Sequence, residues 1–498
     1  MTTRSLPLNP RTLRSHAPHV AVPTYDRTRL APGVVHLSVG AFHRSHQAVY
    51  FDELAQLNCG EGWAVTGVGL RRASLKRALH AQDGLYTVVS RGPDGNSARV
   101  IGVRTRYLFA PHERAAVLAA LVDRRTRLVT LTITGNGYNI DAETGTFAAG
   151  EPDVLHDLVN PGRPQSALGL LVEALRLRRQ AGLRPFTVLS CDNMPGNGAT
   201  ARAAVVGMAA LNDPALAEWI DAHGSFPGSM VDRITPRTTS ADLTLVERQF
   251  GICDRAPVVA EPFMQWVVED DFCDARPSLE EVGVQFVRDV RPYSLAKTRL
   301  LNASHSALGY IGTLAGCSRL DEVMAEEVFA TYVQRMMDDE VVPLLPAVDV
   351  DLLAYTATLR DRLANPVIAD YLSRLCRNGS TKVPGHLLPS IREARALGRP
   401  RGLLTLAVAA WCRYLRGEDE RGRSIEMDDP HAQRLRALAL LGGDDPRPLL
   451  SHQATFGSLG ACSDFVDEVA RDLRELAAVG VRAVAARRAG ADIYGAAA

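Results

Sequence analysis

Three side chains that could assist the oxidation of an alcohol, by proton transfer and hydrogen bonding, lie close together in the segment Lys297-Thr-Arg-Leu-Leu-Asn302-Ala-Ser-His305. An α-helix turns by about 100° per residue, so Lys297, Asn302 and His305 would fall within an arc of about 140° on one face. A lysine that is partly desolvated beside another cation can have a pKa near neutrality and accept a hydroxyl proton. An amide and an imidazole can donate hydrogen bonds to substrate oxygens. The same spacing is also typical of an ordinary helix with a solvated lysine and a packed histidine.

A turn that could receive a pyrophosphate follows the first predicted strand, Val34-Val-His-Leu-Ser-Val39. A tight turn at Gly40 would lead into a helix beginning Ala41-Phe42-His-Arg44, so that main-chain N–H groups and the helix dipole face the phosphates. Ser38 stands where such a motif has its first glycine. A plain strand-to-helix turn therefore stays open as the alternative to dinucleotide binding.

The end of the second predicted strand bears on which dinucleotide binds. An acidic residue in this region binds the adenosine ribose of NAD. Here the sequence has Gly69-Leu-Arg71-Arg72-Ala-Ser74. Two arginines and a serine suit a 2′-phosphate, although arginines at a strand end can also simply face water. We therefore expect Arg71 to contribute to a cofactor site for NAD, with NADP as the alternative.

Strand and helix patterns alternate through the first half of the chain. Strand patterns occur at 34–39, 63–70, 86–90, 128–134 and 186–190, and helical patterns at 45–58, 74–81, 113–122 and 166–181. This alternation favours a mostly parallel sheet covered by helices. Leu128-Val-Thr-Leu-Thr-Ile133 is almost continuously apolar, which is typical of a strand buried on both faces. The expected fold class is α/β, with an N-terminal Rossmann-like doubly wound domain.

Helical patterns follow one another after Pro292. They occur at 295–317, 320–339, 349–363, 366–377, 403–415 and 465–478. Because 498 residues exceed one ordinary core, we expect two domains. The boundaries are 1–290 for the dinucleotide-binding Rossmann-like domain and 291–498 for a mostly α-helical substrate-binding domain. The Ala-, Arg- and Gly-rich segment 482–498 is expected to be a frayed helical tail.

Composition excludes several classes of protein. The 56 basic residues balance 56 acidic ones, so no overall field favours nucleic acid or an anionic membrane. Prolines and arginines interrupt the N-terminal segment, and no later stretch has the roughly 20 apolar residues of a membrane span. A cytoplasmic location is therefore expected. The eight cysteines form no Cys-x-x-Cys pair, so we expect free thiols and no metal site. The oligomeric state, with a monomer among the alternatives, is left open.

Five segments form a more specific pattern. They are Gly40-Ala-Phe42-His-Arg44-Ser-His46-Gln47, Ser190-Cys-Asp192-Asn193-Met, Phe226-Pro-Gly-Ser-Met-Val231-Asp232-Arg233-Ile234, the Lys-x4-Asn-x2-His motif from Lys297, and Arg374-Leu-Cys-Arg-Asn-Gly-Ser-Thr-Lys382. On these segments the chain resembles, over most of its length, the mannitol dehydrogenase family of long-chain polyol-specific dehydrogenases and reductases. The resemblance is most specific at Val-Asp-Arg-Ile.

The resemblance implies roles for these residues. Lys297 would be the general base, Asn193 and Asn302 would hold the alkoxide, and His305 would orient the reacting region. The substrate would also contact Arg374, Lys382 and Asp232, and the cofactor would contact Gly40, Ala41, Phe42, Arg44, Arg71 and Val231. Asp192 is expected to orient its own loop. No zinc is required, which agrees with the lack of a Cys/His ligand cluster.

Two departures from the family pattern concern carboxylates. Members commonly have Glu-Lys-Gly-Tyr where this chain has Gly135-Asn136-Gly137-Tyr138, and often have a glutamate at the position of Ser294. A glutamate there could gate proton exchange between the lysine and solvent. The departures leave two interpretations open, a changed proton path and a changed substrate preference.

The function implied is a metal-independent, NAD(P)-dependent polyol dehydrogenase or ketose reductase of mannitol 2-dehydrogenase type, with D-mannitol and D-fructose as the first pair. The alternative within the superfamily is reduction of a hexuronate such as fructuronate or tagaturonate, whose carboxylate Arg374 or Lys382 could bind. A further alternative is a non-catalytic protein that binds NAD(P) or a sugar. The complete set of Lys297, Asn302, His305 and Asn193 disfavours it.

Overall fold

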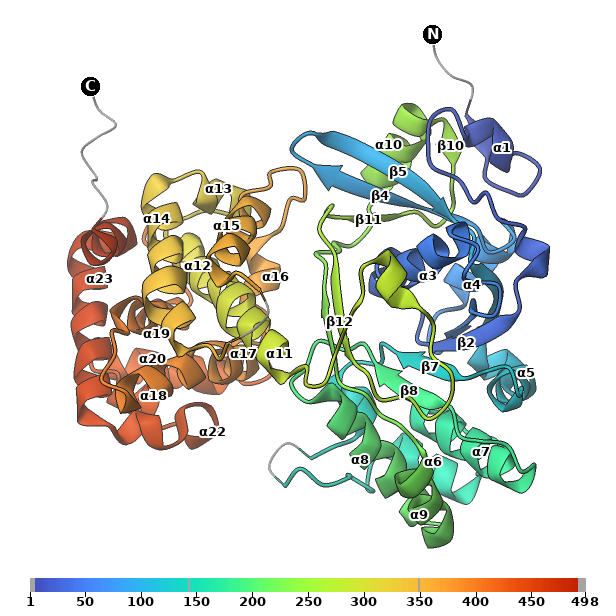
Figure 1. Cartoon of the computed structure of the whole chain (residues 1–498). Helices are drawn as coiled ribbons and strands as arrows, with labels where there is room; N and C mark the ends of the chain where they lie inside the picture. The colour runs from blue at the N-terminus through green and yellow to red at the C-terminus, as the bar shows by residue number, and fades with distance from the viewer. Residues whose placement is uncertain (1–4, 142–143, 348–349, 491–498) are drawn as a thin grey trace. The chain divides into compact units, whose positions relative to one another are not determined.

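The computed structural model describes residues 5–141, 144–347 and 350–490, and the chain divides into two compact units, Met1–Arg291 and Pro292–Ala498 (Figure 1). Within the described residues, all strands belong to the first unit, whereas the second unit is built from helices. Each unit has its own apolar core.

A five-stranded parallel sheet forms the centre of the first unit. Its strands are β2 (Pro32–Leu37), β3 (Ala64–Gly69), β6 (Arg104–Phe109), β7 (Leu128–Leu131) and β8 (Thr187–Ser190), in the order β6-β3-β2-β7-β8. Each neighbouring pair is parallel. The strand order reverses between β2 and β7. The carboxyl ends of these two strands therefore flank the point at which doubly wound sheets bind ligands.

Apolar side chains cover both faces of this sheet. On one face, Leu37 belongs to a buried cluster with residues of α5 (Ala110–Val122) and α7 (Ala167–Gln180). On the other face, Val34 belongs to a cluster with α3 (Gln47–Gln56). The predicted α/β fold with a doubly wound N-terminal sheet is confirmed, and so is the strand predicted at Leu128, which is buried along its length.

Strand β4 (Tyr86–Gly92) lies outside the parallel sheet. It pairs antiparallel with β5 (Gly95–Ile101) and parallel with β11 (Val258–Ala260). The sequence Pro93-Asp-Gly95 turns the chain back at once, so β4 closes a hairpin instead of starting a crossover. The position beside β3 is taken by β6, a strand that sequence patterns did not predict.

A second small sheet carries the Val-Asp-Arg-Ile segment. Strand β9 (Ser229–Asp232) pairs antiparallel with β12 (Gln265–Glu269), which pairs parallel with β13 (Gln285–Val287). These strands were also missed from the sequence. They are three to five residues long, too short for a pattern of alternation to stand out.

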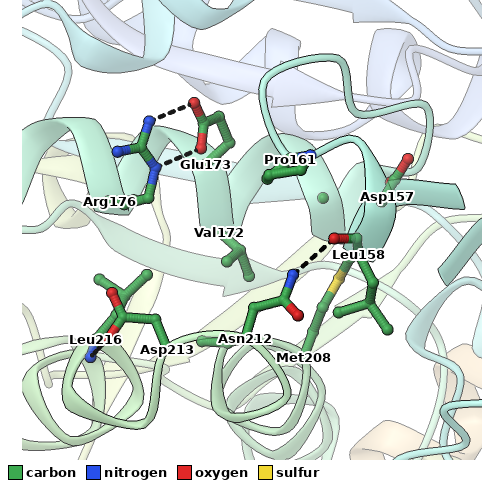
Figure 2. Close-up of a pocket in the computed structure, with 12 residues that line it drawn as sticks. Asp157, Leu158, Pro161, Val172, Glu173, Arg176, Met208, Asn212, Asp213 and Leu216 are labelled. Carbon is green, nitrogen blue, oxygen red and sulfur yellow. Dashed lines mark hydrogen bonds and ion pairs between the residues drawn. The ribbon is translucent and has the colours of Figure 1, made fainter. Parts of the chain in front are cut away.

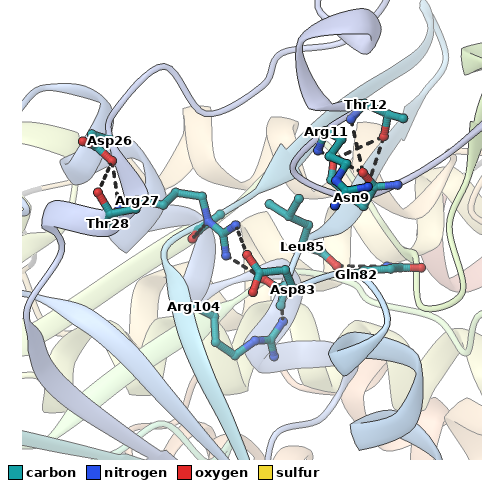
Figure 3. Close-up of polar contacts among 12 residues, drawn as sticks. Asn9, Arg11, Thr12, Asp26, Arg27, Thr28, Gln82, Asp83, Leu85 and Arg104 are labelled. Carbon is teal, nitrogen blue, oxygen red and sulfur yellow. Dashed lines mark hydrogen bonds and ion pairs between the residues drawn. The ribbon is translucent and has the colours of Figure 1, made fainter.

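Polar contacts of Arg27 tie the N-terminal segment to the rest of the first unit (Figure 3). The Arg27 guanidinium donates to the side-chain and main-chain oxygens of Asp83, at 2.8 and 2.6 Å, and to the carbonyl of Gly102 at 2.9 Å. Arg104, at the start of β6, donates to the carbonyl of Gly84 at 3.4 Å. These bonds fix the loop before β4 against the end of the loop that leads into β6.

Helix α12 (Ala303–Leu314) lies in the core of the second unit, with almost every residue buried. It packs against α19 (Gly402–Tyr414), α16 (Leu372–Cys376) and α17 (Gly379–His386). Helix α23 (Ser463–Ala489) packs against α19 in turn (Figure 1). Further α-helices between Arg291 and Phe456 are α11 (Arg291–Lys297), α13 (Leu320–Met324), α14 (Glu327–Arg335), α15 (Leu352–Leu363), α18 (Leu388–Ala396), α20 (Ala432–Gly442), α21 (Arg447–Leu450) and α22 (Gln453–Phe456).

The helical prediction was correct in kind but not in detail. The helix predicted at 320–339 is interrupted between α13 and α14, and of 366–377 only α16 is α-helical. Position 349, where another helix was expected to begin, lies outside the described residues. The tail predicted from 482 was wrong up to Ala489, because Val484 and Ala485 are buried within α23. Positions 491–498 lie outside the described residues.

Candidate active site

The turn after β2 has the backbone conformation of a glycine turn. Ser38 has a φ of +74°, in the left-handed region that glycine adopts most readily. The N–H groups of Ser38 and Val39 both donate to the carbonyl of Val68, at 2.8 and 3.2 Å. The hydroxyl of Thr132 donates to the carbonyl of Ser38 at 2.9 Å. The position expected for a first glycine therefore keeps that conformation with a serine.

Gly40 begins helix α2 (Ala41–Ser45), as predicted. A Cβ atom on Gly40 would meet nothing closer than the carbonyl oxygen of Ser38 at 3.9 Å. The main chain at Gly40 is thus open to a ligand. The first N–H groups of a helix have no partner within it, so they are available to an anion at this end of the sheet.

Two buried arginines join this turn to the Val-Asp-Arg-Ile segment. Arg44 donates to the main-chain carbonyls of Gly40 at 3.3 Å and Ala256 at 2.6 Å. Arg233 donates to the carbonyl of Ser45, at the end of α2. Burial lowers the pKa of both groups, that of Arg233 to about 10. The two sequence motifs are therefore one structure, in which the arginines hold the main chain of the turn.

Asp192 fixes the loop that follows β8. Its carboxylate accepts hydrogen bonds from the N–H groups of Ile133 at 3.0 Å and Thr134 at 2.9 Å, and from the hydroxyl of Tyr138 at 2.7 Å. Burial raises the pKa of Asp192, and these donors oppose the rise. These bonds hold Asp192 against the segment that follows β7, which agrees with the prediction that it orients its loop. Asn193, the next residue, is exposed at the carboxyl end of β8.

Asn197 is a buried clamp that sequence reasoning missed. Its Nδ2 donates to the carbonyls of Ser190, Asp192 and Ser229 at 3.3, 3.0 and 2.9 Å, and its Oδ1 accepts from the N–H of Ser229 at 3.0 Å. The clamp joins the end of β8 to the start of β9. An asparagine after a strand could equally face water, so its position in the sequence did not reveal this role.

Val231 and Asp232 end strand β9 and are both buried. They lie opposite Trp266 and Gln265 of β12 in the antiparallel ladder. Arg71 lies just beyond the carboxyl end of β3 and is exposed. The first unit thus places Asn193, the Gly40 turn and Arg71 after β8, β2 and β3, at the carboxyl edge of its parallel sheet, where β2 and β3 are neighbours and β7 separates β2 from β8.

One π-helical turn, η4 (Thr298–Asn302), joins α11 to α12. The N–H of Ala303 donates to the carbonyl of Thr298, five residues earlier. This bonding pattern defines a π turn, and such turns within α-helices occur frequently at functional sites. The expectation of a regular α-helix was wrong at this turn.

The π turn changes how the predicted catalytic side chains line up. Lys297 and Asn302 are five residues apart, so a five-residue turn brings them onto one face more closely than an α-helix would. Lys297 is buried, whereas Asn302 and His305 are partly buried. Ser294, at the position where a glutamate is common, is partly buried one turn earlier in α11.

Arg374 and Lys382 meet at the end of α16. Arg374 forms a two-point ion pair with Asp370, with 2.6 Å between Nε and Oδ1. The Nζ of Lys382 donates to the carbonyls of Leu375 at 3.0 Å and Arg374 at 3.3 Å. Burial, followed by the positive charge of Arg374, lowers the pKa of Lys382 to about 8. Lys382 is therefore a cation whose charge can change in the slightly alkaline range.

His386 also belongs to this group but was not predicted. Its Nδ1 lies 3.1 Å from the hydroxyl of Ser306, the residue after His305. Burial, then the charges of Lys382 and Lys297, lower the pKa of His386 to about 4. The available signal was spacing, because His386 follows Lys382 by four residues and thus shares its helix face.

A small pocket of about 50 Å³ lies elsewhere in the first unit, among α6 (Pro152–Val159), α7, α8 (Asn197–Ala210) and α9 (Pro214–His223) (Figure 2). Its polar groups are already engaged, as in the ion pair between Glu173 and Arg176. No cluster of three or more His, Cys, Asp or Glu that could hold a metal ion occurs in the described parts of the chain. Among the same residues, every helix is too short or too polar to cross a membrane.

Two family models match the chain. The mannitol dehydrogenase Rossmann domain matches residues 32–281, and the mannitol dehydrogenase C-terminal domain matches residues 289–477. Mannitol dehydrogenase 2 of Saccharomyces cerevisiae is 45% identical over 91% of each chain. Mannitol 2-dehydrogenase of Pyricularia oryzae is 44% identical over 93% of this chain and 94% of its own length.

Two solved structures are similar over nearly the whole chain. Mannitol 2-dehydrogenase of Pseudomonas fluorescens, in a ternary complex with NAD and D-mannitol, has 41% identity and a TM-score of 0.88, covering 98% of this chain and 100% of its own. A D-sorbitol dehydrogenase in substrate-free form has 36% identity and a TM-score of 0.89, covering 96% and 99%.

Proposed function

Because the chain belongs to the mannitol dehydrogenase family, we propose that it is an NAD(P)-dependent polyol dehydrogenase that interconverts D-mannitol and D-fructose. An oxidoreductase acting on CH–OH groups is the enzyme class of this family. The observation that carries the proposal is the π turn between Lys297 and Asn302, since its bonding pattern favours placing residues five apart on one face. The complex of the bacterial relative with NAD and D-mannitol supports the choice of cofactor and substrate.

In the proposed oxidation, Lys297 accepts the proton of the reacting hydroxyl group while the C–H bond of the same carbon breaks and the carbonyl forms. Bound nicotinamide cofactor supplies the acceptor for the hydride. Asn193 and Asn302 donate hydrogen bonds to the substrate oxygen as it becomes negative, and His305 orients the reacting carbon. This scheme uses a lysine and two amides in place of a metal ion.

The residues around the end of β2 fit a dinucleotide. The open main chain at Gly40 allows close approach, and the N–H groups of Ala41 and Phe42 would face a pyrophosphate. Arg44 keeps this turn in place through its bond to the Gly40 carbonyl. Exposed Arg71 would meet the adenosine ribose or its 2′-phosphate, so Arg71→Ala should weaken NADPH binding more than NADH binding.

The decisive experiment concerns Lys297. Lys297→Ala should lower the rate of D-mannitol oxidation by about 10²- to 10⁴-fold, because a general base usually contributes a rate factor of this size. The Kd for NADH, measured by the fluorescence of the bound cofactor, should stay within about twofold of the wild-type value. Added methylamine should restore part of the rate because it replaces the missing amine. Wild-type turnover in Lys297→Ala would remove the lysine from this role.

A hexuronate is the second candidate substrate, favoured by the two cations at the end of α16. One edge of the Arg374 guanidinium is paired with Asp370, and about half of the Arg374 side chain is exposed. Together with Lys382 it could bind a carboxylate. Turnover with D-mannitol, D-arabinitol and a hexuronate, each with NAD and NADP, would identify the substrate.

A further inference from the structure

The imidazole of His386 contacts the helix that carries the catalytic lysine. Its Nδ1 lies 3.1 Å from the Ser306 hydroxyl, on the first turn of α12. The main-chain carbonyl of Asn302, the last residue of the π turn, also interacts with the ring and favours its protonated form. The ring thus contacts both the last residue of η4 and the first turn of α12.

Two lysines act on the same ring. Lys382 precedes His386 by four residues on α17, and Lys297 stands at the start of the π turn. Burial, followed by the charges of Lys382 and Lys297, lowers the pKa of His386 to about 4. The ring is therefore neutral at physiological pH. A neutral imidazole has one N–H donor and one acceptor, which suits the Asn302 carbonyl and the Ser306 hydroxyl.

We propose that His386 is a positioning residue for the reaction of Lys297: its ring holds the π turn through Ser306 and the Asn302 carbonyl. The inference rests on the function proposed above. A π turn leaves main-chain carbonyls without the usual helical partners, and a side-chain donor can hold the turn in place. A charged residue at this position would add a third cation beside Lys297 and Lys382, whereas a neutral ring adds none.

The first test compares two replacements of His386. His386→Leu removes both hydrogen-bonding atoms and should lower kcat for D-mannitol oxidation about 10- to 100-fold, because small displacements of catalytic groups have effects of this size. His386→Asn places a polar atom near the position of Nδ1 and should recover most of kcat. KM for D-mannitol should stay within about threefold in both variants.

His452 provides a matched control. It is a buried histidine of the same unit whose Nδ1 lies 2.9 Å from the Thr455 hydroxyl, away from the π turn. His452→Leu should lower Tm as much as His386→Leu does but leave kcat unchanged. Equal kcat losses in the two variants would show that the effect of His386 is general destabilisation and would overturn the proposal.

The pH dependence separates positioning from proton transfer. Since burial, followed by the charges of Lys382 and Lys297, lowers the pKa of His386 to about 4, the ring is uncharged at pH 6 and at pH 9, and the rate loss in His386→Leu should be the same at both. A loss confined to one side of the profile would mean that the ring itself titrates during turnover, which contradicts the proposal.

A double-mutant cycle tests the contact directly. Ser306→Ala should lower kcat in the same direction, and adding it to His386→Leu should cost little more, because the two side chains act through one bond. Additive effects would contradict the inference. If the wild-type protein oxidises no polyol, the proposed function fails; if the wild type is active and His386→Leu keeps full kcat, only the role of His386 fails.

Discussion

The two regions that carry the candidate site are held in different ways. In the first unit, buried side chains bind the main chain: Asp192 and Asn197 fix the loop after β8, and Arg233 fixes the end of α2. In the second unit, Lys382 contacts the end of α16 and His386 contacts the first turn of α12, and the charge of Lys382 helps to lower the pKa of His386.

This difference has consequences for what each region tolerates. Main-chain clamps in a buried loop contribute to folding, and their loss leaves several polar groups unpaired at once. Neighbouring cations lower one another's pKa values, so what they contribute to stability and to activity depends on pH. We therefore expect mutations in the first region to change stability and mutations in the second to change rates and pH dependence.

The largest effect expected from this comparison is at Asn302. Asn302→Ala removes one donor to the developing negative oxygen, so kcat should fall by about 10²- to 10³-fold. Tm should change little, because Asn302 is only partly buried. Steady-state kinetics and thermal unfolding measure both. The control is Asn160→Ala, an exposed asparagine whose Nδ2 donates to the His156 carbonyl. A large drop in Tm for Asn302→Ala would break the comparison.

Asn197→Ala should have the opposite effect: stability should fall and kcat should change little. It leaves the N–H of Ser229 without its side-chain acceptor, and an unpaired buried group costs about 1–3 kcal/mol of unfolding free energy. The carbonyls of Ser190 and Asp192 each lose one bond but keep those from the Ser229 hydroxyl and the Met194 N–H. Urea unfolding measures the change. At a temperature where the variant is folded, kcat should stay within about threefold. Unchanged stability would show that the clamp is not needed.

Sequence patterns predicted much of this fold, and the reasons for the failures are physical. Long buried strands such as β2 and β3 and the amphipathic α7 have patterns that survive in any context. The short strands β9 and β12 do not, because four or five residues are too few for a pattern of alternation to stand out. The hairpin at β4 depends on the two-residue turn Pro93-Asp94, which strand and helix periodicity does not register.

The site was predicted unevenly for a related reason. Lys297, Asn302 and His305 lie in one continuous helical run, so their spacing placed them on one face, and the family resemblance assigned their roles. Their exact alignment depends on the π turn, which no residue pattern indicates. Asn197 and His386 act through contacts made only in three dimensions, and a sequence shows which residue types are present but not which buried groups need a partner.

Lys382 gives a smaller, pH-dependent effect. Its folded pKa of about 8 lies below the value of about 10.4 expected in the unfolded chain, so the unfolded state binds more protons between these values. Stability should therefore rise as pH increases from about 8 to 10, and Lys382→Met should remove that rise. Thermal unfolding across this range measures it, with Lys76→Met as the control that keeps the rise.

The same titration separates the two substrate classes. Burial and the nearby cations Arg374 and Arg377 disfavour the charged form of Lys382, while Asp370 favours it. As Lys382 loses its proton above pH 8, KM for an anionic hexuronate should increase, whereas KM for neutral D-mannitol should change less than twofold. Equal pH dependence for both substrates would mean that Lys382 does not contact the distal end of either.

The smallest effect is expected at Ser38, where the first unit keeps a glycine conformation with a serine. A non-glycine residue with this φ costs roughly 1–2 kcal/mol, and glycine costs about 0.5–1 kcal/mol in unfolded-state entropy, so Ser38→Gly should stabilise the protein by less than about 1 kcal/mol. Asn58, with a φ of +58°, is the control, because asparagine tolerates this region and Asn58→Gly should be close to neutral.

Since the Ser38 carbonyl and N–H keep their bonds to Thr132 and Val68, NADH affinity should be unchanged. Weaker NADH binding in Ser38→Gly would mean that the serine side chain itself contacts the cofactor, and the first region would then no longer act through its main chain alone.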